Sequence, residues 1–196
     1  MARWKSNTRV RLEQAAIELY LERGFEATTV AEIAERVGLT ERTFFRHFAD
    51  KREVLFDGSH LFQTLIADAV AAAPQSASAL EAVIVGVEAA SIVFQGSAER
   101  SRLRQNIIDA TPELQARDLS KMSALALALA QTLRQRGVPD PAASLAAETG
   151  IVILRSAFER WITPVNQHSW PQLVREALGE LRAVVGGAEE VRKKAD

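Results

Sequence analysis

The sequence predicts an all-α protein, and two observations support that fold class. Apolar residues recur at helical spacing along the chain, and no stretch alternates convincingly at period two. Glycine, proline and serine interrupt these stretches at Gly24, Gly38, 73–78, 136–141 and 163–171. The interrupted pattern predicts roughly nine helices.

The first two helices are separated by clear sequence signals. The first helix is expected near 8–23 and should end at Gly24, which can take the left-handed conformation. Thr29 and Glu32 have the spacing of a capping box, in which each side chain bonds the backbone N–H of the other residue. They predict the start of the second helix.

A tight turn joins the second helix to the third. Gly38 closes the second helix and Thr40 caps the third, which predicts a helix-turn-helix. Asp50 and Glu53 repeat the capping spacing, so a fourth helix is expected to begin there.

The third helix has two chemically different sides. At about 100° per residue, Phe44 and Phe48 share the buried side, with Phe45 at its border. The opposite side carries Arg42, Thr43, Arg46 and His47. An ordinary solvated surface is one interpretation. Presentation to an anion is favoured, because the face has no acid besides the peripheral Glu41 and follows a tight turn.

Overall composition and charge exclude fewer functions than the arrangement of residues on the third helix does. Of 196 residues, 47% are hydrophobic and 25% are charged, with a net charge of −1, so a globular protein is expected and charge alone does not indicate nucleic-acid binding. The absence of cysteine excludes disulfides, thiolate zinc sites and cysteine nucleophiles. No apolar run approaches the roughly 18 residues that span a bilayer, so we expect a cytoplasmic protein.

A basic N-terminal arm with Arg3, Lys5 and Arg9 can contact phosphates or a minor groove, or stay disordered.

The stretch GFEATTVAEIAERVGLTERTFFRHFADKREVL, residues 24–55, resembles the TetR family of bacterial transcriptional regulators. The shared pattern runs from a glycine and an aromatic residue, through paired threonines and Ile-Ala, to aromatic-x-His-Phe and then lysine and leucine. The resemblance implies a helix-turn-helix DNA-binding domain at 1–48 and a helical ligand-binding and dimerisation domain at 49–185. Residues 186–196 are expected to form a flexible tail.

The resemblance also assigns roles by position. Three residues are implied to face base edges in the major groove: Glu41, Arg42 and Arg46. The positions implied to face phosphates are Thr29, Thr40, Thr43, Phe45, His47 and Lys51. Phe45 stands where the family usually has tyrosine, so a hydroxyl contact is lost, and Arg42 stands where a small residue is common. Threonine and lysine suit phosphates, whereas arginine can bond O6 and N7 of guanine together.

Beyond Pro74 the resemblance extends only to architecture. The helices expected at 145–162 and 170–184 correspond to the two with which the family forms its dimer. Candidates for that interface, or for plain core, are Leu145, Ile151, Leu173, Leu178 and Leu181. A pocket with apolar walls and a few polar groups is expected among the middle helices. Its candidates are Phe62, Phe94, Asn106, Phe158 and Trp161.

We therefore expect a homodimeric repressor that leaves an inverted-repeat operator when a small-molecule ligand binds, with no cofactor, metal or membrane partner. Two alternatives stay open. One is the same DNA-binding domain controlled by a protein partner without a small inducer. The other is a helical enzyme or small-molecule carrier whose helix-turn-helix is structural. The enzyme has little support, because His47, His60 and His168 are widely separated and no phosphate loop or nucleophile elbow appears.

Overall fold

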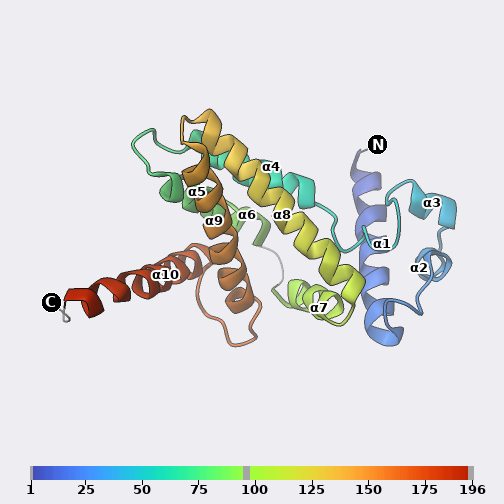
Figure 1. The fold of residues 1–196 in the computed structure, drawn as a ribbon. Helices are drawn as coiled ribbons and strands as arrows, with labels where there is room; N and C mark the ends of the chain where they lie inside the picture. Colours follow the sequence, from blue (N-terminus) through green and yellow to red (C-terminus); the bar gives the residue numbers. More distant parts are fainter. Residues whose placement is uncertain (1, 95–97, 194–196) are drawn as a thin grey trace. The chain divides into compact units, whose positions relative to one another are not determined.

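The computed structural model describes the backbone of residues 2–94 and 98–193 and the side chains of residues 8–93 and 98–186. Within these ranges the regular structure is entirely helical (Figure 1), which confirms the predicted all-α class. The described helices are α1 (Ala2–Arg23), α2 (Val30–Arg36), α3 (Glu41–Phe45), α4 (Ser59–Ala72), α5 (Ala79–Ala89), α6 (Ser91–Phe94), α7 (Ala98–Asp109), α8 (Pro112–Gln135), α9 (Asp140–Trp161) and α10 (Trp170–Lys193).

These helices form two compact units. Unit 1 comprises residues 1–59 and 100–120, and unit 2 comprises residues 60–99 and 121–196. Unit 1 therefore contains α1, α2 and α3 together with most of α7 and the beginning of α8. It is larger than the DNA-binding domain predicted at 1–48.

The core of unit 1 explains its extent. Phe44 and Phe48 are 0% and 3% exposed, with ring centroids 5.4 Å apart. Tyr20 and Phe25 pack edge to face at 5.2 Å. The second segment adds three buried side chains to the same core: Ile107, Ile108 and Leu114. A compact unit ending at residue 48 would lack this part of its core.

The fourth helix begins later than the sequence predicted. Asp50 Oδ1 accepts hydrogen bonds from the backbone N–H groups of Arg52 and Glu53 at 2.8 and 3.0 Å, so the expected cap interaction forms. The chain after it runs in turns as far as Gly58, whose φ is +80°. A left-handed residue interrupts a right-handed helix, so α4 starts only beyond Gly58.

The lengths of the helices bear on two predictions, the flexible tail and the absence of a membrane span. The helix predicted at 170–184 continues to Lys193, so most of the tail predicted at 186–196 is helical, and residues 194–196 lie outside the described residues. Among the described residues, no single helix is long and apolar enough to cross a bilayer. Only 79–93 and 98–109, taken together as a bent pair, reach that length and composition.

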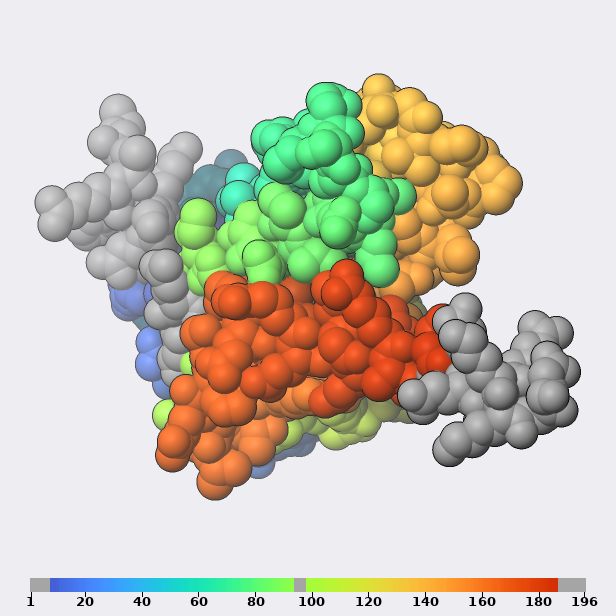
Figure 2. Space-filling model, turned by 90° about the vertical axis from the view of Figure 1, so that its left-hand side faces the viewer, coloured from blue at the N-terminus to red at the C-terminus, as the bar shows by residue number. Residues whose placement is uncertain are grey.

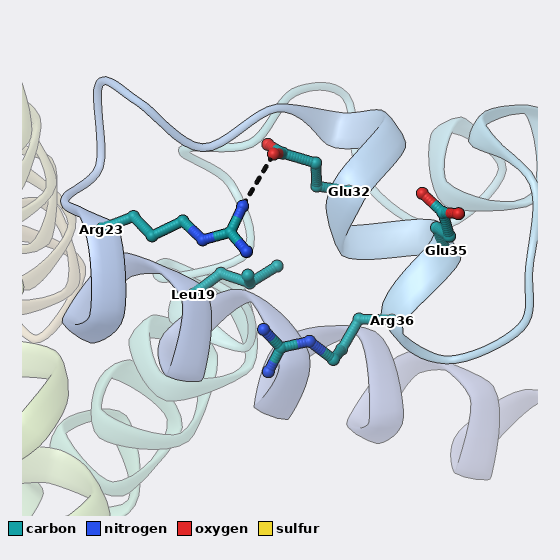
Figure 3. Close-up of a pocket in the computed structure, with 5 residues that line it drawn as sticks. All are labelled: Leu19, Arg23, Glu32, Glu35 and Arg36. Carbon is teal, nitrogen blue, oxygen red and sulfur yellow. Dashed lines mark hydrogen bonds and ion pairs between the residues drawn. The ribbon is translucent and has the colours of Figure 1, made fainter.

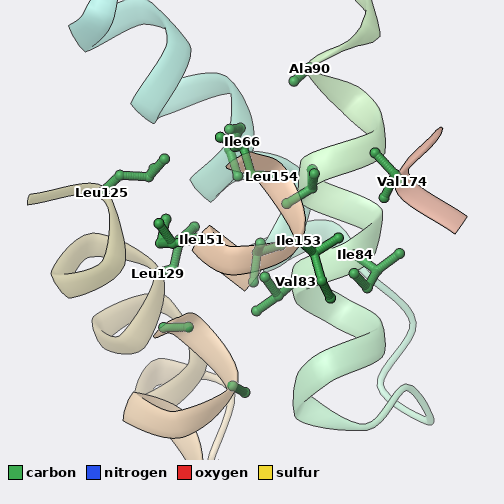
Figure 4. Close-up of a cluster of buried hydrophobic side chains, with 14 of the residues drawn as sticks. Ile66, Val83, Ile84, Ala90, Leu125, Leu129, Ile151, Ile153, Leu154 and Val174 are labelled. Atoms are coloured by element: carbon green, nitrogen blue, oxygen red, sulfur yellow. The ribbon is translucent and has the colours of Figure 1, made fainter. Parts of the chain in front are cut away.

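Unit 2 has its own core, to which five helices contribute. Ile66, Val83, Leu129, Ile151 and Val174 gather from α4, α5, α8, α9 and α10 (Figure 4). In Figure 2, α10 (orange to red) lies along α5 (green), with which it is in contact. The result is a closely packed bundle.

One close helix contact in this bundle involves Gly150 on α9. A Cβ built at Gly150 would lie 2.2 Å from Cγ1 of Val83 on α5, so the two helices meet at a distance that requires glycine. Gly179 on α10 has no heavy atom within 4 Å of the same position and serves as a control.

Gly150→Ala is expected to lower the free energy of unfolding by about 1–3 kcal/mol, because overpacking forces Val83 or the helix backbone to move. Gly179→Ala should be neutral or stabilise the protein by up to about 1 kcal/mol through helix propensity. Urea unfolding of both variants measures this. Equal stability of the two variants would show that α5 and α9 are less closely packed than described.

Candidate nucleic-acid interface

Helix α2 is closed at both ends by hydrogen bonds. Thr29 Oγ1 accepts from the Glu32 N–H at 3.3 Å and Glu32 Oε2 accepts from the Thr29 N–H at 2.8 Å, which confirms the predicted capping box. At the other end, Gly38 has a φ of +67° and the Leu39 N–H donates to Ala34 O at 2.8 Å. The chain therefore turns sharply into α3, as a helix-turn-helix requires.

Helix α3 is short and is held by two buried rings, Phe44 within the helix and Phe48 just after it. Thr40 Oγ1 accepts from the Thr43 N–H at 3.3 Å, so the predicted cap is confirmed. Phe44 is buried, whereas the three residues implied to face bases are exposed: Glu41, Arg42 and Arg46. Arg46 is the C-cap of α3, but its backbone keeps helical angles and its N–H donates to Arg42 O at 3.3 Å. Residues four apart lie on one face of a helical backbone, so Arg42 and Arg46 are presented together.

Arg42 and Arg46 also differ from the other cations of unit 1. Among the described side chains of 8–59 and 100–120, theirs are the two cationic groups without a hydrogen bond or ion pair to the protein. Arg36, for example, pairs with Glu22 at 2.8 Å. The guanidinium groups of Arg42 and Arg46 are therefore available to an external acceptor.

Lys51, in contrast, directs its charge into the protein. Its Nζ donates to the backbone oxygens of Phe25, Thr28 and Glu26 at 2.8, 3.0 and 3.4 Å. The ammonium also lies 4.3 Å from the centroid of the Phe25 ring, and the carbonyl of Lys51 accepts from the Tyr20 hydroxyl at 2.7 Å. An ammonium has three N–H donors, so the phosphate contact implied for Lys51 would have to break one of these bonds.

The other implied phosphate positions differ in exposure. Thr29 and Thr40 are exposed, and Phe45 is exposed although it is a large apolar side chain. Thr43 is half-buried, with its hydroxyl oxygen 3.2 Å from that of Thr40, and His47 is half-buried. Thr29 and Thr40 are thus exposed at the starts of α2 and α3, and the Thr29 hydroxyl, which donates to Glu32 Oε2 at 2.9 Å, would have to exchange this bond for one to a phosphate. A phenylalanine offers no hydrogen bond.

The N-terminal arm is only partly described. Helix α1 begins at Ala2, earlier than the predicted start near residue 8, and the side chains of Arg3 and Lys5 lie outside the described ones. Arg9 forms an ion pair with Asp57, and its guanidinium carbon lies 5.1 Å from the centroid of the Phe48 ring. A DNA contact by Arg9 would compete with this ion pair.

Comparison with known proteins relates the helix-turn-helix to one protein family. The family model described as "Bacterial regulatory proteins, tetR family" matches residues 13–57, which include α2, α3 and their turn. MftR of Mycobacterium tuberculosis, named for transcriptional regulation of mycofactocin biosynthesis, is 28% identical over 192 residues, 95% of this chain and 93% of that protein. The helix-turn-helix region of the chain therefore matches the TetR family. The regulator TcmR of Streptomyces glaucescens is 57% identical over 47 residues, 24% of this chain and 21% of that protein.

Solved TetR-family structures share the fold. SmeT, the repressor of the Stenotrophomonas maltophilia multidrug efflux pump SmeDEF, matches with a TM-score of 0.57 and 18% identity, covering 90% of this chain and 89% of that one. A transcriptional regulator of Aquifex aeolicus matches with a TM-score of 0.52 and 17% identity, covering 90% and 99%. The match of residues 13–57 to the TetR family model and the full-length similarity to a transcriptional regulator identify the protein as a DNA-binding transcriptional regulator.

The residues predicted for a ligand pocket are divided between the units. Phe62, Phe158 and Trp161 belong to the core region of unit 2, where the rings of Phe158 and Trp161 are 6.1 Å apart. Asn106 is exposed and lies in unit 1, and the side chain of Phe94 is outside the described ones. Three of the five, all of them aromatic, therefore lie in the core region of unit 2, and two of them, Phe158 and Trp161, are neighbours.

A hollow of about 270 Å³ lies elsewhere, between α1 and α2 in unit 1 (Figure 3). It is lined by Leu19, Arg23, Glu32, Glu35 and Arg36. Arg23 and Glu32 pair with each other across it at 3.0 Å. Its charged lining differs from the apolar pocket that the sequence predicted, and none of the predicted pocket residues lines it.

Most residues predicted for a TetR-family dimer interface are core in the single chain. Ile151, Leu173 and Leu178 are buried in unit 2, and Leu181 is half-buried. Leu145 is 70% exposed. The helical spacing of apolar residues marks both faces of α9 and α10 alike, so it could not separate core from surface.

The sequence did not predict a group of ion pairs around the α3–α4 connection. Arg52 pairs with Asp50 and with Glu113, each at 2.6 Å, and Arg117 pairs with Glu53. Partial burial raises the pKa of Asp50, but hydrogen bonds from the Arg52 guanidinium and from the backbone N–H groups of Glu53 and Arg52 outweigh it, so the pKa is lowered. No local signal could reveal partners about 60 residues apart in the sequence.

Asp50→Asn is expected to lower the free energy of unfolding at pH 7 by about 0.5–1 kcal/mol, because the amide loses the ion pair with Arg52 at a partly exposed site. The pKa of Asp50 is lower in the folded protein than in the unfolded chain, where it is about 3.9. The ion pair therefore stabilises the fold above that value, and this stabilisation is lost as the pH falls through the pKa of the folded protein. The difference in free energy of unfolding between Asp50→Asn and wild type should therefore shrink below about pH 4. Urea unfolding at several pH values between acid and neutral measures this difference. Asp68→Asn, at an exposed aspartate, is the control. A difference in free energy of unfolding that does not change with pH would contradict the account.

Proposed function

We propose that the protein is a homodimeric, cytoplasmic repressor that binds an inverted-repeat operator near the genes it controls and leaves it when a small molecule binds unit 2. The observation that carries the DNA-binding part is the pair of unpaired guanidinium groups on the exposed face of α3. All other cations described in unit 1 have partners in the protein. The match of residues 13–57 to the TetR family model supports the same assignment.

In this proposal, different residues recognise the DNA bases and position the protein on the phosphates. With α3 in the major groove, Arg42 and Arg46 bond O6 and N7 of guanine, and Glu41 accepts from the amino group of cytosine. The exposed hydroxyls of Thr29 and Thr40 bond phosphates, and Thr43 and His47 lie near the same strand. Phe45 offers only apolar contact there.

Two copies are needed because one short recognition helix makes few base contacts. A two-fold dimer places two such helices on an inverted repeat. Exposed apolar side chains on the last two helices support this assembly: Leu145 and Val152 on α9, 70% and 59% exposed, and Val184 and Val185 on α10. Part of the outward surface of α10 faces the viewer in Figure 2.

The ligand part of the proposal rests on the aromatic residues of unit 2. Phe62, Phe158 and Trp161 offer apolar walls of the kind that small-molecule sites use. Phe94 stays a candidate for the same site. Asn106 belongs to unit 1, so a role for it in that site is not supported.

Arg46→Ala is expected to weaken binding to the preferred DNA site by about 1–3 kcal/mol and to flatten discrimination at one base pair of each half-site. Arg42→Ala should act in the same way with a smaller effect, because the TetR-family pattern that residues 24–55 resemble commonly has a small residue at this position. Fluorescence titrations on DNA from the region upstream of the gene, and on single-base variants, measure both. Arg155→Ala on α9 removes an exposed arginine of unit 2 and should have little effect.

Uniform weakening by Arg46→Ala on every DNA sequence, with base preference unchanged, would show that α3 does not read bases in this way. Equal effects of Arg46→Ala and Arg155→Ala would contradict the assignment of the interface to α3.

The double variant Leu145→Glu, Val152→Glu is expected to shift the protein from dimer to monomer and to weaken operator binding at the same time, because both residues lie one above the other on the exposed face of α9. Sedimentation measures the assembly. Leu127→Glu, an exposed leucine of α8, is the control. Leu173 and Leu178 are unsuitable because charges there would disrupt the core of unit 2. A double variant that stays dimeric would place the interface elsewhere.

A further inference from the structure

We infer that Lys51 is a positioning residue, which fixes the loop between α1 and α2 and thereby the start of α2, and does not contact a DNA phosphate. The inference rests on the proposed DNA-binding function, because it concerns how the helix-turn-helix is held in shape for DNA. It replaces the phosphate role implied for Lys51 by its sequence position.

The ammonium of Lys51 is placed at the centre of the loop 24–29. The three backbone oxygens that accept its N–H groups belong to Phe25, Glu26 and Thr28, at 2.8, 3.4 and 3.0 Å. The Phe25 ring covers the same nitrogen at 4.3 Å. A loop of this kind has few hydrogen bonds of its own, so one cation that binds three backbone carbonyls within residues 25–28 determines its path.

The backbone of Lys51 is fixed as well. Its carbonyl accepts from the hydroxyl of Tyr20 at 2.7 Å, and Tyr20 is buried on α1 against the Phe25 ring. Lys51 therefore joins the end of α1, the loop and the segment after α3 through contacts at both of its ends. Loss of the side chain leaves the hydroxyl bond in place, so the fold can persist while the loop loosens.

The loop leads directly into the helix-turn-helix. Thr28, whose carbonyl Lys51 binds, precedes Thr29, the N-cap of α2. The hydroxyl of Thr28 also donates to Gly24 O at 2.9 Å. Because α2 packs on α3, a shift of Thr29 moves the helix that supports the recognition helix.

The geometry requires a compact cation. Three acceptors converge on one nitrogen, which suits an ammonium with three donors, whereas a guanidinium is a wider planar group with its donors in a fixed fork. A phosphate contact has the opposite requirement, because arginine serves it at least as well as lysine. Lys51→Arg therefore separates the two roles.

The test compares full-length wild type, Lys51→Met and Lys51→Arg. Dissociation constants for a DNA fragment from the upstream region are measured at four salt concentrations, and amide hydrogen exchange is followed over residues 24–32. We expect both variants to bind about tenfold more weakly, as the loss of charged hydrogen bonds implies. The slope of log K against log salt should equal that of wild type in both, and exchange over 24–32 should be faster.

A phosphate contact gives a different result. Lys51→Met would then reduce the slope by about 0.9, while Lys51→Arg would keep both affinity and slope, and this outcome would overturn the inference. Unchanged exchange over 24–32 in both variants would overturn it too. If Lys51→Met does not fold, Lys51→Arg alone decides. Failure of wild type to bind any DNA would contradict the proposed function, whereas the exchange measurement would still test the role of Lys51 in the loop.

Discussion

The burial of Phe44 and Phe48 in the core of unit 1 is the constraint on which the DNA-binding surface depends. Helix α3 has only five residues, far fewer than the roughly 12–15 that an isolated helix needs in water, so packing and not helix propensity holds it. Each buried phenylalanine contributes about 1.5–3 kcal/mol. Since these rings fix the inner side of α3, Arg42 and Arg46 must face outward.

The distribution of ion pairs completes this arrangement. Arg9, Arg36 and Arg52 each pair with a carboxylate in unit 1, and Lys51 binds backbone oxygens. Exposed pairs of this kind contribute little to stability, about 0–1 kcal/mol each. Their larger effect is to neutralise most of the positive charge, so that the unpaired charge of unit 1 is concentrated on α3. A chain with a net charge of −1 can thus present a local cationic surface.

Local sequence signals predicted the helix-turn-helix because its caps and turns involve residues within a few positions of each other. The Thr29–Glu32 box, the Thr40 cap and the turn at Gly38 are of this kind. The prediction failed for the start of α4, where a correct cap at Asp50 is followed by turns. Contacts between residues distant in the sequence could not be predicted either. The core residues of 100–120 and the hydrogen bonds from Lys51 to the loop follow no periodicity in the sequence. Apolar spacing likewise could not distinguish buried Leu173 from exposed Leu145.

The central claim is that α3 reads guanines in the major groove, and methylation protection at guanine N7 tests it most directly. The retarded complex between the protein and DNA from its own upstream region should protect guanines in two half-sites, related by a two-fold axis and spaced by about 10 base pairs or a multiple of that. Retardation without any protection of guanine N7, or no retardation of any such DNA at low salt, would contradict the account.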